Sequence, residues 1–271
     1  VTPPPTITND SNAIIANMIN NKVIEPVHPT EYIRKNSIRS FMFLRKKWDD
    51  DVEIMKGRLC ADGSSLAKAA FPNEYYSPCV DFKTITTTLA MTNDPKNERK
   101  VYDVKEAFTR ALIGDREVFM TIEPEVTKRL VNKQQAPSHW KDYPEKGVLY
   151  VQLKKALYGL PESSLLWYNT VNRVLERNGF TRCQEDYCLY KKDILTIFSS
   201  PKSSSKSLTE STKTALEAEF GKLKEKSGDD LLYLGFRIIK KKNCIVLDQT
   251  HYWDKLIEEY KAYSLKEYHT P

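Results

Sequence analysis

The sequence predicts an α+β fold, because expected strands and helices interleave along the chain and an expected hairpin stands near each end of that run. The first hairpin covers residues 38–43 and 52–60, with residues 48–51 as its turn. The second covers residues 231–239 and 244–247, around a lysine-rich turn. This alternation argues for an architecture of packed layers of strands and helices.

The elements between the hairpins follow from apolar spacing and from turn residues. Residues 1–30, rich in Pro, Asn and Thr, predict a loose N-terminal lead-in with one short helix. The remaining strands are short apolar runs at residues 101–104, 148–153 and 194–198. Helices are expected where apolar residues recur at helical spacing, at residues 80–91, 163–178, 209–224 and 252–260.

Length and composition are those of a globular chain with one large domain or two smaller ones. The 271 residues are 40% hydrophobic and include 15 Tyr, 10 Phe and 4 Trp, which argues against disorder. The net charge of +6 permits a polyanionic partner without requiring one. No run of about 18 apolar residues occurs, so no membrane span is expected.

The N-terminus and the cysteines bear on the compartment. The first residues lack the charged and apolar segments of a signal peptide. Five cysteines without a Cys-x-x-Cys pair are expected to be reduced thiols. The sequence therefore predicts an intracellular protein, cytoplasmic or nuclear. Because the chain begins with Val1, we expect it to be a fragment of a larger polyprotein.

Residues 103–108 place a carboxylate near the end of an expected strand and an aromatic side chain five positions later. Nucleotide addition uses two Mg²⁺ ions about 3.5–4 Å apart, and Mg²⁺ prefers hard oxygen ligands. Asp103 is therefore a candidate catalytic residue and metal ligand. Phe108 is a candidate to pack under a sugar and exclude a 2′-hydroxyl. Taken alone, the pattern is more typical of a helix-capping aspartate and a core phenylalanine.

A second block, residues 153–163, is followed at once by an expected helix that carries Trp167. Together with residues 103–108, it resembles the reverse transcriptase of copia-type retrotransposons, and the resemblance extends in order over residues 38–271. It implies a right-hand polymerase fold with fingers, an antiparallel palm sheet and a partial thumb.

The resemblance also implies domain limits and roles for basic residues. The fingers and palm would occupy residues 31–205, and residues 206–271 would form the end of the palm and a partial thumb. Lys56 and Arg58 stand in the fingers motif that grips the incoming triphosphate, and guanidinium binds phosphate in a bidentate fashion. Outside this context, Arg58 would be interpreted as a solvated strand residue.

Two acidic residues depart from the family pattern. Asp62 stands where a second Lys or Arg is usual, and Glu162 stands where Gln is usual. Both are expected to bring negative charge towards a triphosphate. Glu162 and Ser163 belong to the loop that positions template and nucleotide, so the resemblance implies nucleotide-binding roles for both.

The family's second metal motif, an aromatic-x-Asp-Asp turn, is missing. Phe198 is followed by Ser-Ser-Pro at residues 199–201, where x-Asp-Asp is expected. Removing one group that stabilises the transition state costs about 3–4 kcal/mol, so the sequence predicts impaired catalysis. Asp229 and Asp230, which follow Gly228, are interpreted as a charged turn and not as the missing pair.

The sequence therefore predicts a retrotransposon-derived RNA-directed DNA polymerase domain that is catalytically impaired. Its expected partners are an RNA template, an RNA/DNA hybrid primer-template and dNTP, with Mg²⁺ as the cofactor and no membrane. The alternative is a non-enzymatic nucleic-acid-binding remnant of a polymerase, which the positive charge and the aromatic residues favour. A third hypothesis is an unrelated protein whose similarity is accidental.

Overall fold

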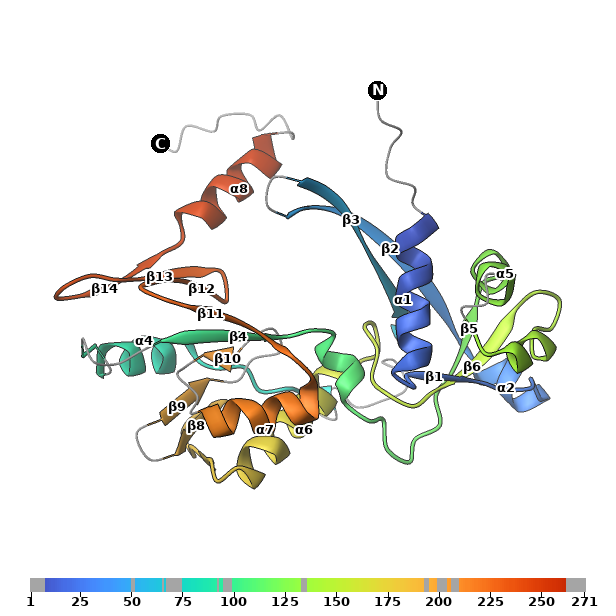
Figure 1. Ribbon diagram of the computed structural model, residues 1–271, viewed down its shortest axis with the longest axis horizontal. Helices are drawn as coiled ribbons and strands as arrows, with labels where there is room; N and C mark the ends of the chain where they lie inside the picture. Colours follow the sequence, from blue (N-terminus) through green and yellow to red (C-terminus); the bar gives the residue numbers. More distant parts are fainter. Residues whose placement is uncertain are drawn as a thin grey trace, which may run out of the picture. The chain divides into compact units, whose positions relative to one another are not determined.

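The computed structural model describes residues 8–49, 52–64, 66, 75–91, 93–94, 99–132, 136–192, 195–198, 204–205 and 210–261 (Figure 1). Two compact units interleave along the chain. Unit 1 consists of Val1–Ser77 and Glu106–Thr170, and unit 2 of Pro78–Lys105 and Val171–Pro271. The domain limits expected at residues 30 and 205 stay predictions. Among the described residues, no helix has the length and apolar character needed to cross a membrane.

Unit 1 contains a five-stranded sheet with the strand order β1-β6-β5-β2-β3. Its strands are β1 (Ile24–Pro26), β2 (Ile38–Asp49), β3 (Val52–Ala61), β5 (Phe119–Ile122) and β6 (Leu149–Leu153). β2 and β5 are parallel, and the other neighbouring pairs are antiparallel. Helical elements of this unit are α1 (Thr8–Asn20), α2 (Glu31–Asn36), η2 (Ala107–Arg110), α5 (Pro124–Asn132) and η3 (Ser138–Asp142).

The predicted first hairpin is confirmed, and its strands are longer than expected. β2 and β3 stay in register from Ser40 opposite Ala61 to Asp49 opposite Val52. The expected turn is therefore wrong at its start, because Trp48 has a high strand propensity and continues the ladder together with Asp49. Residues 50 and 51 lie outside the described residues.

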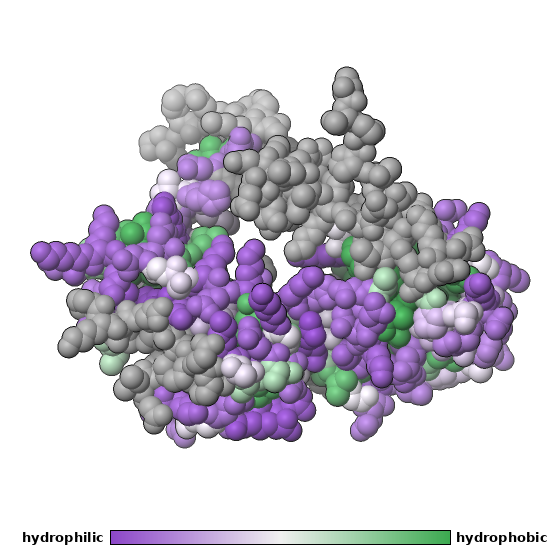
Figure 2. Space-filling model, viewed as in Figure 1, coloured by the Kyte–Doolittle hydropathy of each residue, from purple (hydrophilic) through white to green (hydrophobic). Residues whose placement is uncertain are grey.

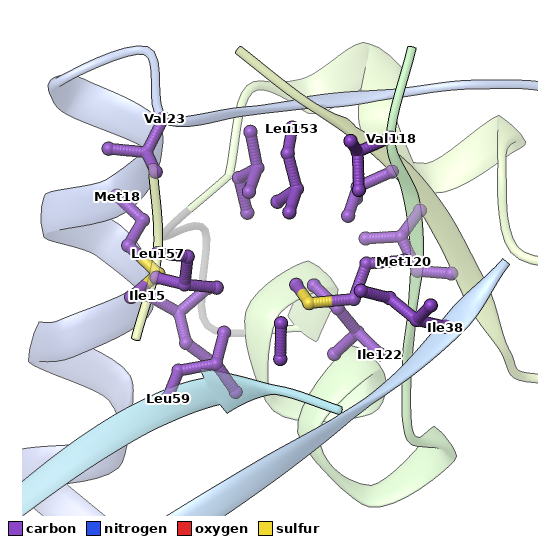
Figure 3. Packing of buried hydrophobic residues seen from close by; sticks show 14 of the residues in the cluster. Ile15, Met18, Val23, Ile38, Leu59, Val118, Met120, Ile122, Leu153 and Leu157 are labelled. Carbon is purple, nitrogen blue, oxygen red and sulfur yellow. The ribbon is translucent and has the colours of Figure 1, made fainter. Parts of the chain in front are cut away.

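The core of unit 1 includes one face of α1. Ile15 and Met18 lie three positions apart on that face and are 1% and 8% exposed (Figure 3). β1 pairs with β6 through Ile24 and Leu153, which belong to the same core. The prediction of a loose lead-in is therefore wrong for residues 14–26, because their apolar side chains complete the core and their backbone extends the sheet.

Unit 2 contains two antiparallel sheets. The six-stranded sheet, in the order β11-β4-β10-β9-β8-β7, consists of β4 (Lys100–Val104), β7 (Thr181–Arg182), β8 (Leu189–Lys192), β9 (Leu195–Phe198), β10 (Ser204–Ser205) and β11 (Leu223–Ser227). The three-stranded sheet consists of β12 (Asp230–Tyr233), β13 (Phe236–Lys240) and β14 (Ile245–Asp248). Helices of this unit are α4 (Phe82–Met91), α7 (Glu210–Phe220) and α8 (Thr250–Lys261), and the boundary between the units falls within α6 (Ser163–Arg177).

A hydrophobic core of unit 2 forms beneath α4. Ile85 and Leu89 of α4 are buried together with Val101 of β4, Tyr233 of β12 and Ile238 of β13. This confirms the helix expected over residues 80–91. The face of the molecule in Figure 2 is mostly hydrophilic, with hydrophobic residues in small separate areas.

The predicted strand over residues 231–239 is in fact two strands. Leu234 and Gly235 have φ angles of 50° and 86°, a left-handed turn that glycine adopts readily. Tyr233 of β12 therefore pairs with Phe236 of β13. The expected hairpin is confirmed as β13 and β14.

The helix expected over residues 209–224 ends earlier than predicted. α7 ends at Phe220, and Gly221 follows with a φ of 76°, the left-handed conformation common just after a helix. Leu223 and Lys224 then belong to β11, a strand that the sequence analysis did not predict. This strand pairs with β4, so the correction bears directly on the surroundings of Asp103.

Candidate functional site

Asp103 lies on β4, an inner strand of the six-stranded sheet of unit 2, between β11 and β10. It pairs with Lys224 of β11, while Tyr102 pairs with Ser204 of β10. Asp103 is exposed and Tyr102 is 2% exposed, as expected for neighbours on opposite faces of a sheet. The Asp103 carboxylate is therefore open to solvent on a strand that has a neighbouring strand on each side.

The register of β9 and β10 relates the missing metal motif to the strand that carries Asp103. Phe198, the last residue of β9, pairs with Ser205 of β10, and Ser204 pairs with Tyr102. In this antiparallel register, the start of β10 lies at the Asp103 end of β4. Residues 199–203, which contain the Ser-Ser-Pro sequence, lie outside the described residues.

The described residues contain no group of three or more His, Cys, Asp or Glu side chains that could hold a metal ion. Glu225 of β11 pairs with Tyr102, so it lies on the face opposite to Asp103. Hydrogen bonds from Lys213 and Lys100, whose ammonium groups lie 2.9 and 3.0 Å away, hold the pKa of Glu225 below its usual range. Asp103 is thus the single predicted metal ligand in the described part of the chain.

Tyr158 joins two of the predicted nucleotide-binding residues in unit 1. The guanidinium of Arg58 lies 5.1 Å from the centre of the Tyr158 ring. The ring of Phe108 lies 4.7 Å from the same ring, centre to centre. A cation over an aromatic face is attracted by the ring quadrupole, and the contact also restricts the guanidinium. Arg58 and Phe108, fifty positions apart, are therefore brought to one aromatic side chain.

The loop that carries Tyr158 is locked onto the end of β3. The amide of Ala61 donates a hydrogen bond of 2.7 Å to the carbonyl of Tyr158. Gly159 has a φ of 93°, and a Cβ added there would lie 1.9 Å from the carbonyl oxygen of Ala61. A Cβ on Gly63 would lie 2.3 Å from the carbonyl oxygen of Gly159. Both glycines permit a close approach of two backbones, which fixes the distance between β3 and Tyr158.

The other predicted residues of the fingers motif are placed less completely. Lys56 pairs with Arg45 in the β2–β3 ladder, and its side chain lies outside the described part of the structure. Asp62 accepts hydrogen bonds from the hydroxyl and amide of Ser64, which hold the pKa of Asp62 below its usual range. The Arg39 guanidinium lies 4.0 Å from the Asp62 carboxylate. The Asp62 carboxylate, which departs from the family pattern, is therefore held by the neighbouring side chains of Ser64 and Arg39.

Glu162 and Ser163 lie buried at the start of α6. The Glu162 carboxylate accepts a hydrogen bond of 2.7 Å from Nη1 of Arg116, which offsets its negative charge. The Ser163 hydroxyl donates a hydrogen bond of 2.6 Å to the carbonyl of Leu157. Their predicted roles in nucleotide binding stay predictions. In the structure, their polar atoms hold the chain around Tyr158 and the start of the helix.

A hydrogen bond from α1 reaches the loop between β4 and η2. The side-chain amide of Asn17 donates to Oε1 of Glu106 at 2.7 Å. Glu106 has a φ of 56°, and its carbonyl accepts hydrogen bonds from the amide and hydroxyl of Thr109 in η2. Neither Asn17 nor Glu106 was predicted as a site residue. Asn17 lies in the segment expected to be loose, so no sequence signal connected it to Phe108.

Comparison with known proteins places the chain among the nucleic-acid polymerases. A family profile described as "Reverse transcriptase (RNA-dependent DNA polymerase)" matches residues 32–271. The chain belongs to this family of reverse transcriptases. The predicted resemblance to the copia-type enzymes is confirmed, and so is the expected α+β fold with antiparallel strands. The assigned roles of individual site residues stay predictions.

The relatives are longer than this chain. The retrovirus-related Pol polyprotein from transposon TNT 1-94 of Nicotiana tabacum is 25% identical over 160 residues, which are 58% of this chain. The chain spans 11% of the length of that curated relative. A solved structure of the foamy viral protease-reverse transcriptase dRH in complex with double-stranded DNA is similar with a TM-score of 0.47 and 12% identity. It covers 96% of this chain and 37% of its own.

Proposed function

We propose that this reverse transcriptase domain is impaired in RNA-directed DNA synthesis because its second pair of metal-binding carboxylates is missing. The observation that carries the proposal is the Ser-Ser-Pro sequence at residues 199–201, between β9 and β10. The start of β10 lies at the Asp103 end of β4. A carboxylate pair at residues 200 and 201 would therefore follow β9 in the chain and precede the strand next to Asp103.

In the family reaction, the 3′-hydroxyl of a primer attacks the α-phosphate of a dNTP, and pyrophosphate leaves. Divalent metal ions, when bound, stabilise the charge on the attacking and leaving oxygens. We assign Asp103 as a ligand of Mg²⁺, Lys56 and Arg58 to the triphosphate and Phe108 to the sugar. The RNA template and the RNA/DNA hybrid are the proposed macromolecular partners.

A primer-extension assay tests the impairment. The purified chain is given an oligo(dT) primer on poly(rA), with dTTP and either Mg²⁺ or Mn²⁺. We expect incorporation at the background level of the Asp103→Asn variant, because one carboxylate cannot hold two metal ions in the required geometry. Robust incorporation by the unaltered chain that Asp103→Ala abolishes would overturn the proposal.

A restored variant makes the assay specific for the missing motif. Ser200→Asp combined with Pro201→Asp recreates aromatic-x-Asp-Asp after Phe198. We expect this double substitution to raise incorporation at least tenfold over the unaltered chain, and Asp103→Asn to remove the gain. The matched control is Ser200→Asn with Pro201→Asn, which introduces polar side chains of similar size without carboxylates.

A non-enzymatic nucleic-acid-binding role is the second candidate, and the net charge of +6 favours it. Binding of a labelled RNA/DNA hybrid that weakens steeply with salt, without extension by the unaltered chain, would support this role. Hybrid binding that is weak at low salt or insensitive to salt would contradict it.

A further inference from the structure

Three basic residues lie on separate segments of unit 1 whose backbones come together around Lys155. Lys22 follows α1, Arg110 ends η2, and Lys155 follows β6. The backbone draws the three segments together, because the amide of Lys154 donates to the carbonyl of Val23 at 2.9 Å, and the amide of Ala156 to that of Ala111 at 2.8 Å. Each of these bonds is made by residues next to the basic residues themselves.

The positive charge of these three residues, which we call the basic triad, is not neutralised within the described residues. No carboxylate there forms an ion pair with Lys22, Arg110 or Lys155. Nε of Arg110 is buried and has no hydrogen-bond partner among the described atoms. Burial, with the positive charges of Arg110 and Lys22, lowers the pKa of Lys155.

The neighbouring lysine is in a different situation. The ammonium of Lys154 donates to Oε1 of Gln152 at 2.7 Å and lies 3.4 Å from the carboxylate of Glu25. Two adjacent lysines thus differ in kind, because Lys154 is partnered by protein groups whereas Lys155 faces like charges. Lys155 and Arg110 are half-buried and Lys22 is exposed. Grouping such cations without an acid is unfavourable, unless an anion from outside the chain supplies the missing charge.

We propose that the basic triad is a binding site for a backbone phosphate of the RNA/DNA hybrid. A phosphodiester carries one negative charge and acceptor oxygens that suit the guanidinium of Arg110 and the two ammonium groups. Arg110 shares the short helix η2 with Phe108, so this phosphate contact would lie on the element that carries the predicted sugar contact. Lys22 precedes the family-matched residues 32–271, so the site includes a residue outside that region. The inference rests on the proposed nucleic-acid partner.

The test measures the salt dependence of hybrid binding. The dissociation constant of a fluorescently labelled RNA/DNA hybrid is determined by anisotropy at several salt concentrations for the intact chain. The variants are Lys155→Gln, Arg110→Gln and Lys22→Gln, with Lys154→Gln as the matched control of equal charge change one position away. Lys22 is exposed, so its variant tests the site without altering the interior of the unit.

Because the three residues share one phosphate, each substitution in the basic triad is expected to lower the slope of log affinity against log salt by at most about 0.9, the value for one lost phosphate contact. Lys154→Gln is expected to leave the slope unchanged. Melting curves check folding, and Lys155→Gln is expected to melt no lower than the unaltered chain because it removes a repulsion. Equal slopes for the Lys155 and Lys154 variants would overturn the site while leaving the proposed partner intact.

Two further arms separate the possible sources of the phosphate. If dTTP or tripolyphosphate loses affinity for the Lys155 variant while the hybrid does not, the anion is a triphosphate and the assignment to the backbone is overturned. If the unaltered chain binds no hybrid at any salt concentration, the site and the proposed nucleic-acid partner both fail. A loss of hybrid affinity without a loss of dTTP affinity supports the backbone assignment.

Discussion

Tyr158 contacts two of the predicted nucleotide-binding residues of unit 1 through its aromatic ring. Arg58 and Phe108 both lie against it, at 5.1 and 4.7 Å from its centre. A guanidinium that is already oriented loses less conformational freedom when it binds phosphate. The aromatic ring at position 158, and not its hydroxyl, is therefore expected to matter for nucleotide affinity.

Tyr158→Ala is expected to weaken binding of dTTP to the chain by about two- to fivefold, the equivalent of an exposed cation–π contact. Tyr158→Phe is the matched control, because it keeps the ring, and it is expected to bind like the unaltered chain. Isothermal titration in the presence of saturating hybrid measures both constants. An equal loss in the two variants would show that the hydroxyl is responsible.

The bond between Asn17 and Glu106 holds a residue in a costly conformation. A residue other than glycine in the left-handed region costs about 1–3 kcal/mol, and Glu106 has a φ of 56°. The 2.7 Å hydrogen bond from Asn17 fixes this side chain at the start of η2. Asn17 is therefore expected to act as a positioning residue for Phe108 through Glu106.

Exchanging donor and acceptor tests this role. Asn17→Asp places two carboxylates at hydrogen-bond distance, so it should destabilise η2 at neutral pH. Adding Glu106→Gln to this variant should restore the hydrogen bond, with residue 106 now the donor and residue 17 the acceptor. In Asn17→Asp, repulsion raises the folded-state pKa of the pair above its unfolded value, so the destabilisation should disappear as the pH falls and the pair takes up a proton. Hydrogen exchange of residues 106–110 measures both effects, and failure of the double variant to recover would count against direct coupling.

The contact between β3 and the Tyr158 loop is the element that sets the site's geometry. Gly159 cannot accept a Cβ at its present distance from Ala61, whereas Gly114, with a similar φ of 81°, has no heavy atom within 4 Å of an added Cβ. The two glycines therefore separate the cost of the backbone conformation from the cost of the close approach.

Gly114→Ala is expected to lower the free energy of unfolding by about 1–2 kcal/mol, the penalty for an L-residue in the left-handed conformation. Gly159→Ala should lower the free energy of unfolding further than Gly114→Ala does. The same conformational penalty applies there, and the new Cβ also clashes with a backbone carbonyl that cannot rotate away. Urea denaturation followed by tryptophan fluorescence compares the two variants. Equal midpoints would mean that β3 and the loop separate easily.

Helices and strands could be predicted from the sequence where apolar residues repeat at regular spacing. They could not be predicted where pairing with a distant segment determines the local conformation. α4 was expected from Ile85 and Leu89, and both are buried as predicted. β11 was missed because Leu223 is its one buried residue, so the segment shows no alternation. Its strand conformation comes from pairing with β4, which is far away in the sequence.

At the scale of the whole molecule, the N-terminal segment is part of the folded reverse transcriptase domain although the family match begins at residue 32. A helix in this segment was predictable, but its burial was not, because the sequence does not reveal which strands cover Ile15 and Met18. The junction of Arg58, Phe108 and Tyr158 was hidden for the same reason. Each residue carried a local signal, whereas their meeting depends on tertiary structure.

A chain that begins at Tyr32 is therefore expected not to fold stably. It would lack α1 and β1, which supply Ile15, Met18 and Ile24 to the core and a neighbour to β6. Circular dichroism melting and limited proteolysis measure the loss. In the full chain, Ile15→Ala should cost about 2–5 kcal/mol, whereas Asn20→Ala, at an exposed position of the same helix, should cost little. A truncated chain with an unchanged melting midpoint would contradict this expectation.

The interleaving of the two units also has a consequence for synthesis on the ribosome. Unit 1 needs the segment Glu106–Thr170 as well as Val1–Ser77, and unit 2 needs residues on both sides of that segment. Domains usually fold in order as they emerge, but here neither unit is complete until well over half of the chain has been translated. Until Thr170 has left the exit tunnel, β2 and β3 lack strands and helices that complete their unit, so their apolar residues stay exposed to solvent during synthesis.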